Sequence, residues 1–357
     1  MTLKGRAASL AEVLDSMTAE AAPELTERLP SGALRCYACG HRCLVQPGRR
    51  GICKVRFNES GRLLVPTDYV AALACDPTEK KPFFHLLPGS DTLTFGMLGC
   101  DLHCAYCQNW LTSQTLRDDA AGTAPRRVSA ERLVALAGAY GARVVGSSYN
   151  EPLITAEWAA RVFRLAKAEG FRTAFISNGN ATPQVLDYLR PLTDCYKIDL
   201  KSMSDRGYRQ LGGVVSNILD TVRMAHERGF WTEVVTLLVP GFNDSDEEVR
   251  RAAEFIASVS PDIPWHVTAF HQDYRMTENA DTTAEQLVRA CEAGREAGLR
   301  FVYAGNMPGR VGRWENTYCP ACDCLLVERR GYRILTQRVG ADGLCPQCSA
   351  AIPGVWK

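Results

Sequence analysis

From residue 92 onward, short apolar segments alternate with longer amphipathic ones, and this alternation constrains the fold more than any other feature. The segments expected as strands are Thr92–Gly96, Arg143–Ser148, Arg172–Ser177, Cys195–Leu200, Thr232–Val239, His266–Phe270 and Phe301–Ala304. The segments expected as helices span residues 129–140, 155–169, 183–190, 216–229, 245–259 and 284–297. Strands separated by helices pair in parallel, because each return crossover needs a helix. The pattern predicts an α/β fold, a partial or full (β/α) barrel, with a doubly wound open sheet as the alternative.

Cysteine is the unusual part of the composition, with 15 residues in the chain. All except Cys75, Cys195 and Cys291 fall in three groups, at 36–53, 100–107 and 319–348. Isolated cysteines are more often buried apolar residues than ligands. The first thirty residues carry charges and no apolar core segment, so we expect no secretory signal and a cytoplasmic location. In that compartment, grouped cysteines indicate metal or iron–sulfur chemistry rather than disulfides.

Length and charge limit the domains and partners. A chain of 357 residues accommodates one barrel-sized domain with small appendages. We expect an N-terminal segment with a Cys-rich knuckle at 1–75, a barrel domain at 76–310 and a zinc-ribbon-like module at 311–357. A short amphipathic helix is expected at 9–19. With 41 basic and 40 acidic residues and no run of eighteen apolar ones, we expect neither a membrane nor a nucleic acid as partner.

The central cysteines follow the first expected strand directly. Cys100, Cys104 and Cys107 have the spacing C-x3-C-x2-C. Three thiolates in one loop can hold three irons of a 4Fe–4S cluster and leave the fourth iron without a protein ligand. An open coordination position indicates catalysis, by the logic that applies to metal sites in general. The alternative is a zinc loop with a distant fourth ligand, and the position after the first strand of a β/α series favours the cluster.

The flanking cysteines form two further groups. Four of them have the spacing C-x2-C-x3-C-x9-C, namely Cys36, Cys39, Cys43 and Cys53. They suit zinc, which is the default for a closed structural site, or an accessory 4Fe–4S cluster; reduced core thiols without metal are a third alternative.

The C-terminal group consists of two CxxC pairs, Cys319 with Cys322 and Cys345 with Cys348. A hairpin expected between them, formed by Leu325–Val327 and Tyr332–Leu335, completes the pattern of a zinc ribbon. The pairs suit zinc or an accessory cluster, and the additional Cys324 complicates the choice of ligands. With few aromatic residues interleaved among basic ones, the module is interpreted as a clamp or a lid on the substrate side.

The central cysteine loop belongs to a longer series of motifs. It is followed by Gln108-Asn109-Trp110, and the other motifs are Asp76–His85, Pro88–Ser90, Ser148–Pro152, Ser177–Gly179, Asp199–Lys201, Val239–Asp244 and Tyr303–Asn306. With these motifs and the Cys-rich tail, the chain resembles radical S-adenosylmethionine (SAM) enzymes. Among them it resembles the AmmeMemoRadiSam-system family, which is similar to pyruvate formate-lyase activating enzymes. The resemblance covers nearly the whole chain after residue 35.

The resemblance implies a radical SAM barrel, SAM as cofactor and a set of contacts to it. Tyr106 would contact the adenine, and Ser148 and Glu151 end the second strand, where the family has a Gly-Gly-Glu motif for the SAM amino group. The glycines are absent here, but Glu151 is retained as a partner for an ammonium group. The further SAM contacts implied are Ser177 and Asn178 near the ribose or methionyl group, Asp199 and Lys201 near the carboxylate, and His271. Ile176 replaces an Asp of the activating enzymes.

Each of these residues also has a structural interpretation. Glu151 can cap a helix that starts near Leu153. Asn178-Gly179 is a common turn dipeptide, and Asp199 with Lys201 can form a surface pair of little energetic value. Their shared position at the ends of consecutive strands favours a common site, because a barrel places its chemistry there.

The leading interpretation is therefore an enzyme that reductively cleaves SAM at a 4Fe–4S cluster and acts on an unidentified substrate. The substrate can be a small molecule or a protein, and activation of a glycyl radical protein is the first alternative. A metal-bearing binding or scaffold protein is the second, although it leaves the central loop unexplained. The expected partners are an electron donor such as flavodoxin or ferredoxin, and the resemblance adds Memo-like and Ammecr-like proteins.

Overall fold

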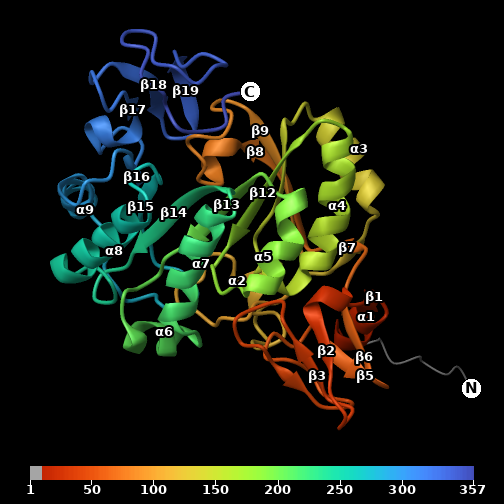
Figure 1. Cartoon of the computed structure of the whole chain (residues 1–357). Helices are drawn as coiled ribbons and strands as arrows, with labels where there is room; N and C mark the ends of the chain where they lie inside the picture. Colours follow the sequence, from red (N-terminus) through yellow and green to blue (C-terminus); the bar gives the residue numbers. More distant parts are fainter. Residues whose placement is uncertain (1–9) are drawn as a thin grey trace, which may run out of the picture.

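An eight-stranded sheet forms the centre of the computed structural model, which describes residues 10–357 (Figure 1). Across the sheet the strands are β16 (Val302–Gly305), β15 (Trp265–Ala269), β14 (Trp231–Leu238), β13 (Cys195–Asp199), β12 (Arg172–Ser177), β11 (Val144–Ser147), β9 (Asp91–Gly96) and β8 (Ala72–Pro77). All neighbours pair in parallel except β8, which runs antiparallel to β9. The seven strands expected from the sequence are confirmed to within two residues, and β8 was not expected.

The crossover helices lie where the amphipathic segments predict them. They are α3 (Ala130–Ala139), α4 (Ala156–Ala168), α5 (Pro183–Leu189), α7 (Val215–Glu227), α8 (Asp246–Val259) and α9 (Ala284–Glu296). Polar caps fix several starts, because a Ser or Thr oxygen accepts an amide that has no partner within the helix. The capping residues are Ser129 for α3, Thr182 for α5, Ser245 for α8 and Thr283 for α9.

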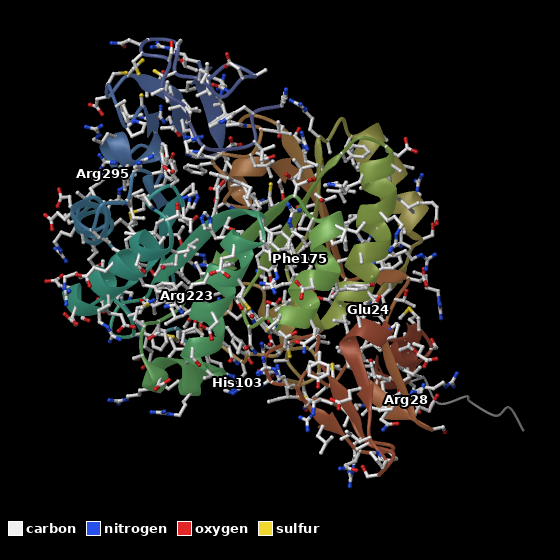
Figure 2. The ribbon with its side chains drawn as sticks, viewed as in Figure 1. Glu24, Arg28, His103, Phe175, Arg223 and Arg295 are labelled. Carbon is white, nitrogen blue, oxygen red and sulfur yellow. The ribbon has the colours of Figure 1, made fainter. Side chains whose placement is uncertain are left out.

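The order of the strands distinguishes between the two α/β architectures. From β9 to β16, sheet neighbours are also consecutive strands of the chain. A doubly wound sheet reverses its strand order at a switch point, so that alternative is wrong. Within the described residues the pairing ends at β8 and β16, and the sheet is open. Figure 2 shows Phe175 of β12 at the centre of the molecule, where it is fully buried, and Arg295 near the edge of the view.

The N-terminal region contains short strands that the sequence analysis did not anticipate. Two three-stranded antiparallel sheets are formed, by β1 (Thr18–Glu20), β6 (Arg62–Pro66) and β5 (Phe57–Glu59), and by β2 (Thr26–Arg28), β3 (Leu34–Cys36) and β4 (Leu44–Val45). A third pair joins β7 (Tyr69–Val70) to β10 (Arg126–Arg127). The helix expected at 9–19 is shorter, α1 (Leu10–Asp15), because the chain turns to pair β1 with β6; residue 9 lies outside the described residues.

The C-terminal module carries the expected hairpin, with longer strands. It is built from β17 (Thr317–Tyr318), β18 (Leu325–Arg330) and β19 (Arg333–Gln337). Figure 1 shows this module beside β16, on the opposite side of the sheet domain from the N-terminal strands. The remaining elements are the helices α2 (Trp110–Ser113) and α6 (Asp205–Leu211) and the 3-10 turns Pro23–Leu25, Thr78–Lys80, Pro152–Thr155, Arg190–Leu192 and Gly312–Glu315. None of the helices in residues 10–357 combines the length and apolarity needed to span a bilayer.

A chain of hydrogen bonds fastens the C-terminal module to the sheet domain. Arg329 donates to Thr317 Oγ1 at 2.7 Å, and the Thr317 and Tyr303 hydroxyls lie 2.9 Å apart. His85 Nε2 lies 2.6 Å from the Tyr303 hydroxyl and His85 Nδ1 lies 2.6 Å from the carbonyl oxygen of Pro353. Since that carbonyl only accepts, Nδ1 carries the proton and Nε2 accepts from Tyr303. A neutral His85 thereby satisfies both of its own ring nitrogens and the Tyr303 hydroxyl.

Candidate active site

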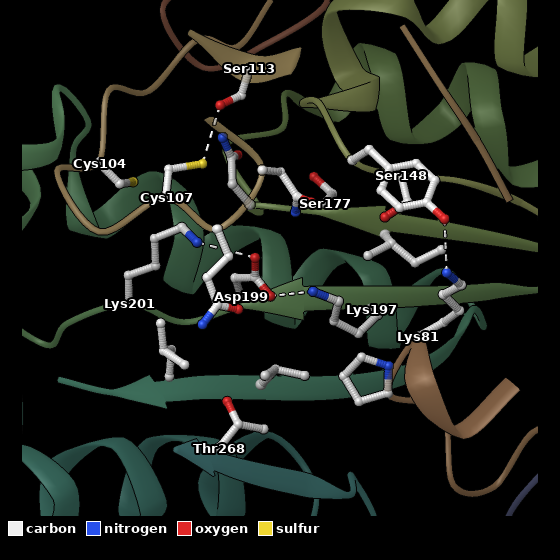
Figure 3. A pocket seen from close by; sticks show the side chains of 18 of the residues that line it. Lys81, Cys104, Cys107, Ser113, Ser148, Ser177, Lys197, Asp199, Lys201 and Thr268 are labelled. Carbon is white, nitrogen blue, oxygen red and sulfur yellow. Dashed lines mark hydrogen bonds and ion pairs between the residues drawn. The ribbon is translucent and has the colours of Figure 1, made fainter. Parts of the chain in front are cut away.

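The cysteine loop follows β9 and lines a cavity of about 410 Å³, a volume in the range of small-molecule sites. Cys104 is buried, whereas Cys100 and Cys107 are half-buried. The amide of Leu102 lies 3.4 Å from Cys100 Sγ, and the Ser113 hydroxyl lies 3.1 Å from Cys107 Sγ, as Figure 3 shows. Hydrogen bonds to sulfur of this kind tune iron–sulfur centres.

The packing of the three thiols bears on whether they bind one metal ion or a cluster. Among the described residues, the C-terminal cysteines form a group whose ligand atoms all lie within 4.8 Å of one another. The three cysteines of the central loop do not form such a group. One metal ion needs its ligands that close, whereas a cubane binds each thiolate to a different iron and spreads the thiolates further apart. The three thiols line one cavity without the close packing of a single-ion site, and this arrangement is compatible with a cubane.

Most of the SAM contacts expected from the sequence line this same cavity. They are Tyr106, Ser148, Glu151, Ser177, Asn178, Asp199 and Lys201. Tyr106 is buried, and its ring centroid lies 5.6 Å from that of Phe242. His271 differs from the expectation: it is exposed, does not line the cavity and contacts the carbonyl oxygen of Gln272. The chain turns outward after β15, so its position near a strand end does not bring it inside.

Glu151 is buried and joins the ends of two strands. Its carboxylate accepts the Ser177 hydroxyl at 2.8 Å and the Asn178 amide at 2.7 Å. It also accepts the amide of Leu153 at 3.0 Å, so the interpretation of Glu151 as a cap is confirmed. Burial, and then the neighbouring Asp101 carboxylate, raise the pKa of Glu151 above its ordinary value. Glu151 lines this side of the cavity and forms its acidic wall, whereas Asp101 is fully buried and does not line it.

The opposite wall is basic. Figure 3 shows Lys197 and Lys201 approaching Asp199 from two sides. Lys201 Nζ lies 3.1 Å from Asp199 Oδ2, and Lys197 contacts the other carboxylate oxygen. Burial acts to raise the pKa of Asp199, but the two ammonium groups outweigh it and lower that pKa to about 2. With two cations and one anion, the trio carries one excess positive charge, and its partial burial rules out a mere surface pair.

Several cavity residues escaped the sequence analysis. Lys81 Nζ donates to the Tyr149 hydroxyl at 3.0 Å, and both line the cavity together with Lys197, Asn306 and Tyr332. Tyr149 has a positive φ of 71°, which is uncommon for a residue other than glycine and often marks a functional site. The sequence did contain a signal for Lys81 and Tyr149, because they belong to the motifs Asp76–His85 and Ser148–Pro152. Tyr332 lies in the C-terminal module, and no local pattern connects it to this cavity.

The C-terminal cysteines form a compact group. Cys319 and Cys348 have sulfur atoms 3.6 Å apart, and those of Cys322 and Cys345 are 3.7 Å apart. A tetrahedral zinc with Zn–S bonds of about 2.3 Å needs a sulfur spacing of about 3.8 Å. The group is therefore an additional site whose geometry suits one metal ion.

Comparisons with known proteins agree with this geometry. The Radical SAM superfamily matches residues 95–256, which include the central cysteines and both walls of the cavity. The chain is 34% identical over 305 residues to "Uncharacterized protein MJ0808" of Methanocaldococcus jannaschii, covering 85% of this chain and 90% of that protein. It is 28% identical over 206 residues to pyruvate formate-lyase 1-activating enzyme of Escherichia coli K12, covering 54% and 80%.

A solved structure of a radical SAM methyltransferase from Sphaerobacter thermophilus is also similar. It shares 18% identity with a TM-score of 0.46, over 67% of this chain and 71% of that one. The superfamily match, together with the open three-cysteine loop, establishes the cofactors as a 4Fe–4S cluster and SAM. The chain therefore belongs to the radical SAM superfamily and is a SAM-dependent enzyme.

Proposed function

We propose that Cys100, Cys104 and Cys107 hold three irons of the catalytic cluster and that SAM binds in the cavity beside them. The observation that carries this proposal is the convergence of the three thiols, the acidic wall and the basic wall on one cavity. Held by these residues, the cluster and SAM would supply reductive cleavage of SAM and a radical for a substrate. The protein positions the reactants and excludes water.

The charges of the two walls complement the methionyl group of SAM. Glu151 faces the cavity as a buried carboxylate and suits the ammonium group. Lys201, in the trio with one excess positive charge, suits the carboxylate. Ser177 and Asn178 act as positioning residues, since both already donate to Glu151. Tyr106 contacts the adenine in this proposal, and Ser148 lies at the end of the second strand of the motif series. His271 is exposed and outside the cavity, so its proposed contact with SAM has no support.

The substrate side of the cavity lies between the sheet domain and the C-terminal module. Lys81, Asn306 and Tyr332 line it, and Tyr332 donates to Asn306 Oδ1 at 3.3 Å. We propose that the module, at 311–357, is a zinc-bound ribbon that acts as a lid there, and that the open sheet forms a partial barrel at 76–310. The proposed N-terminal unit remains 1–75, and its boundary lies within β8.

The resemblance of the motifs supports a more specific assignment. We propose an AmmeMemoRadiSam-system enzyme with Memo-like and Ammecr-like partners, an electron donor such as flavodoxin or ferredoxin, and a cytoplasmic location. All fifteen cysteines are free thiols, which suits a reducing compartment. Activation of a glycyl radical protein is the second candidate, supported by the similarity to the activating enzyme of E. coli over 206 residues.

The test is SAM cleavage by the anaerobically reconstituted chain. Wild type with dithionite and SAM should release 5′-deoxyadenosine, and Cys104→Ala should not. Cys75→Ala, which changes a half-buried cysteine outside the loop, is the matched control and should retain cleavage. Absence of any SAM cleavage product from a preparation that contains iron would refute the proposal. A glycyl radical signal in a partner protein would favour the second candidate.

A further inference from the structure

A second group of thiols, Cys36, Cys39, Cys43 and Cys53, lies in the N-terminal region and is not used by the proposed function. Cys43 is half-buried and the other three are buried. The amide of Cys36 donates to the carbonyl oxygen of Cys43 at 2.9 Å, which closes the turn between them. Burial is the main cause of the raised pKa of Cys39, Cys43 and Cys53, and the Cys36 thiol contributes to all three. Cys43 packs against the apolar cluster that contains Cys36, and the amide of Ile52, next to Cys53, lies 3.5 Å from Cys43 Sγ, so these thiols share one neighbourhood.

The quartet differs from the C-terminal cysteines in how closely its sulfur atoms pack. The C-terminal cysteines have the 3.6 and 3.7 Å sulfur separations of a single-ion site. Among the residues that the structure describes, neither the quartet nor the catalytic trio forms a group with all ligand atoms within 4.8 Å. A closed zinc site requires about 3.8 Å between sulfurs, whereas a cubane separates its thiolates because each binds its own iron. The quartet therefore lacks the compact packing of a single-ion site, which leaves a cluster as the occupant that its chemistry suits.

Donors around the quartet indicate an anionic occupant. The amide of Ile52 lies 3.5 Å from Cys43 Sγ. The guanidinium of Arg56 is 1% exposed and lies near Cys36 and Cys53, whose charges act on it. Glu157 binds two of its nitrogens, but Arg56 Nε is buried without a hydrogen-bond partner. A buried donor without an acceptor is rare, and cluster sulfur atoms beside it would supply one.

The quartet is also packed directly against the catalytic loop. Arg117 donates to the carbonyl oxygen of Leu102 at 3.0 Å and to that of Ile52 at 2.8 Å, so it joins the two loops. Gly99, which precedes Cys100, has no side chain, and a Cβ there would lie 3.3 Å from the carbonyl oxygen of Cys53.

A second contact joins the two cysteine loops on another side. His41, between Cys39 and Cys43, has Nε2 3.1 Å from the carbonyl oxygen of Asp101. The amide of Gly40 donates to the carbonyl oxygen of Asn180 at 2.7 Å. A Cβ at Gly40 would lie 2.2 Å from Asn180 Oδ1, so this close approach requires glycine. The loops that carry the two sets of thiols are thus in direct contact.

We propose that Cys36, Cys39, Cys43 and Cys53 bind a second 4Fe–4S cluster, which delivers electrons to the catalytic one. The inference rests on the proposed function for the identity of its electron acceptor. The accessory cluster takes one electron from a one-electron donor protein and passes from the 2+ to the 1+ state. It returns to 2+ as the catalytic cluster is reduced to 1+, and that electron is consumed when SAM is cleaved.

Metal content tests the site without reference to activity. Wild type reconstituted anaerobically with iron and sulfide should contain about eight irons per chain, and Cys36→Ala/Cys43→Ala about four. Cys104→Ala/Cys107→Ala should also retain about four, now in the quartet. Cys75→Ala is the matched control and should match wild type. A wild type with about four irons, or a quartet variant with undiminished iron, would overturn the proposal.

The choice of reductant tests the electron path. With dithionite, which is small and reaches either cluster, the quartet variant should still cleave SAM. With reduced flavodoxin it should cleave SAM at least about tenfold more slowly than wild type, since the donor docks at the protein surface. Equal rates with flavodoxin would refute the relay. If the variant does not fold, Mössbauer and EPR spectra of wild type decide, because two coupled clusters differ from one. Loss of cleavage with dithionite in wild type would instead refute the proposed function.

Discussion

The buried ion pair between Arg56 and Glu157 gives the sharpest prediction about stability. Arg56 stands just before β5, and Glu157 is in the first turn of α4, so the pair connects the N-terminal strands to the sheet domain. Two nitrogen–oxygen distances of 2.7 Å make it bidentate, and the side chains are only 2% and 12% exposed. Burial opposes the charge on Arg56, but the nearby Cys36 and Glu157 raise its pKa.

Replacing Glu157 with Leu removes the acceptor and leaves the guanidinium buried. Breaking a buried pair on one side typically costs about 3–5 kcal/mol, because an uncompensated charge stays behind. The double variant Arg56→Met/Glu157→Leu leaves no such charge and should recover most of the loss. At about 1.4 kcal/mol per factor of ten, a loss of about 3 kcal/mol corresponds to roughly 100-fold faster local opening.

Hydrogen–deuterium exchange measures that opening region by region. We expect the amides of β5 and β6 to exchange roughly 100-fold faster in Glu157→Leu. The matched control is Glu247→Leu, whose partner Arg250 is half exposed, and pairs of that kind contribute about 1 kcal/mol or less. If Glu157→Leu exchanged no faster than the control, or the double variant exchanged as fast as the single one, the reasoning would be refuted.

Three further predictions concern other parts of the molecule. Burial lowers the pKa of His85 from 6.5 to about 4, so its contribution to stability is complete above pH 6.5. Thermal unfolding should show that the free energy of unfolding falls by up to about 3 kcal/mol as the pH falls towards 4. His85→Gln should make this free energy less dependent on pH. Gly40→Ala forces Asn180 to move and should lower the free energy of local opening in residues 36–53 by about 1–3 kcal/mol, so that their amides exchange faster. Gly138→Ala adds a methyl group in open space and should leave exchange unchanged. Lys201→Met should weaken SAM binding at least about tenfold in equilibrium dialysis, with iron content unchanged.

The sheet and the position of the central cysteine loop beside the cavity were predictable because their signals are local. Alternation of short apolar segments with amphipathic ones determined seven parallel strands and their helices, to within two residues. The spacing of Cys100, Cys104 and Cys107 needs only one loop to place three thiols around one cavity. The end of each parallel strand falls at the same edge of the sheet, and this rule brought Glu151, Asn178 and Asp199 together.

The short N-terminal strands and β8 had no comparable signal. Strands of two to six residues have too few positions to show a period, and they form because antiparallel partners stand close in the fold. His271 shows the opposite error. Its place after a strand suggested the cavity, but the path of the loop that follows turned it to the surface.

Contacts between residues distant in sequence were decided by the tertiary structure alone. Tyr332 and Lys81 line one cavity although 251 positions separate them in the numbering. Cysteine spacing alone left zinc and an iron–sulfur cluster open for both flanking groups, and only the tertiary structure showed that the C-terminal sulfur atoms lie close enough for one metal ion. Spacing along a chain encodes local geometry, because a few dihedral angles connect neighbouring ligands. Distances across the molecule depend on how every intervening element packs, and no short segment carries that information.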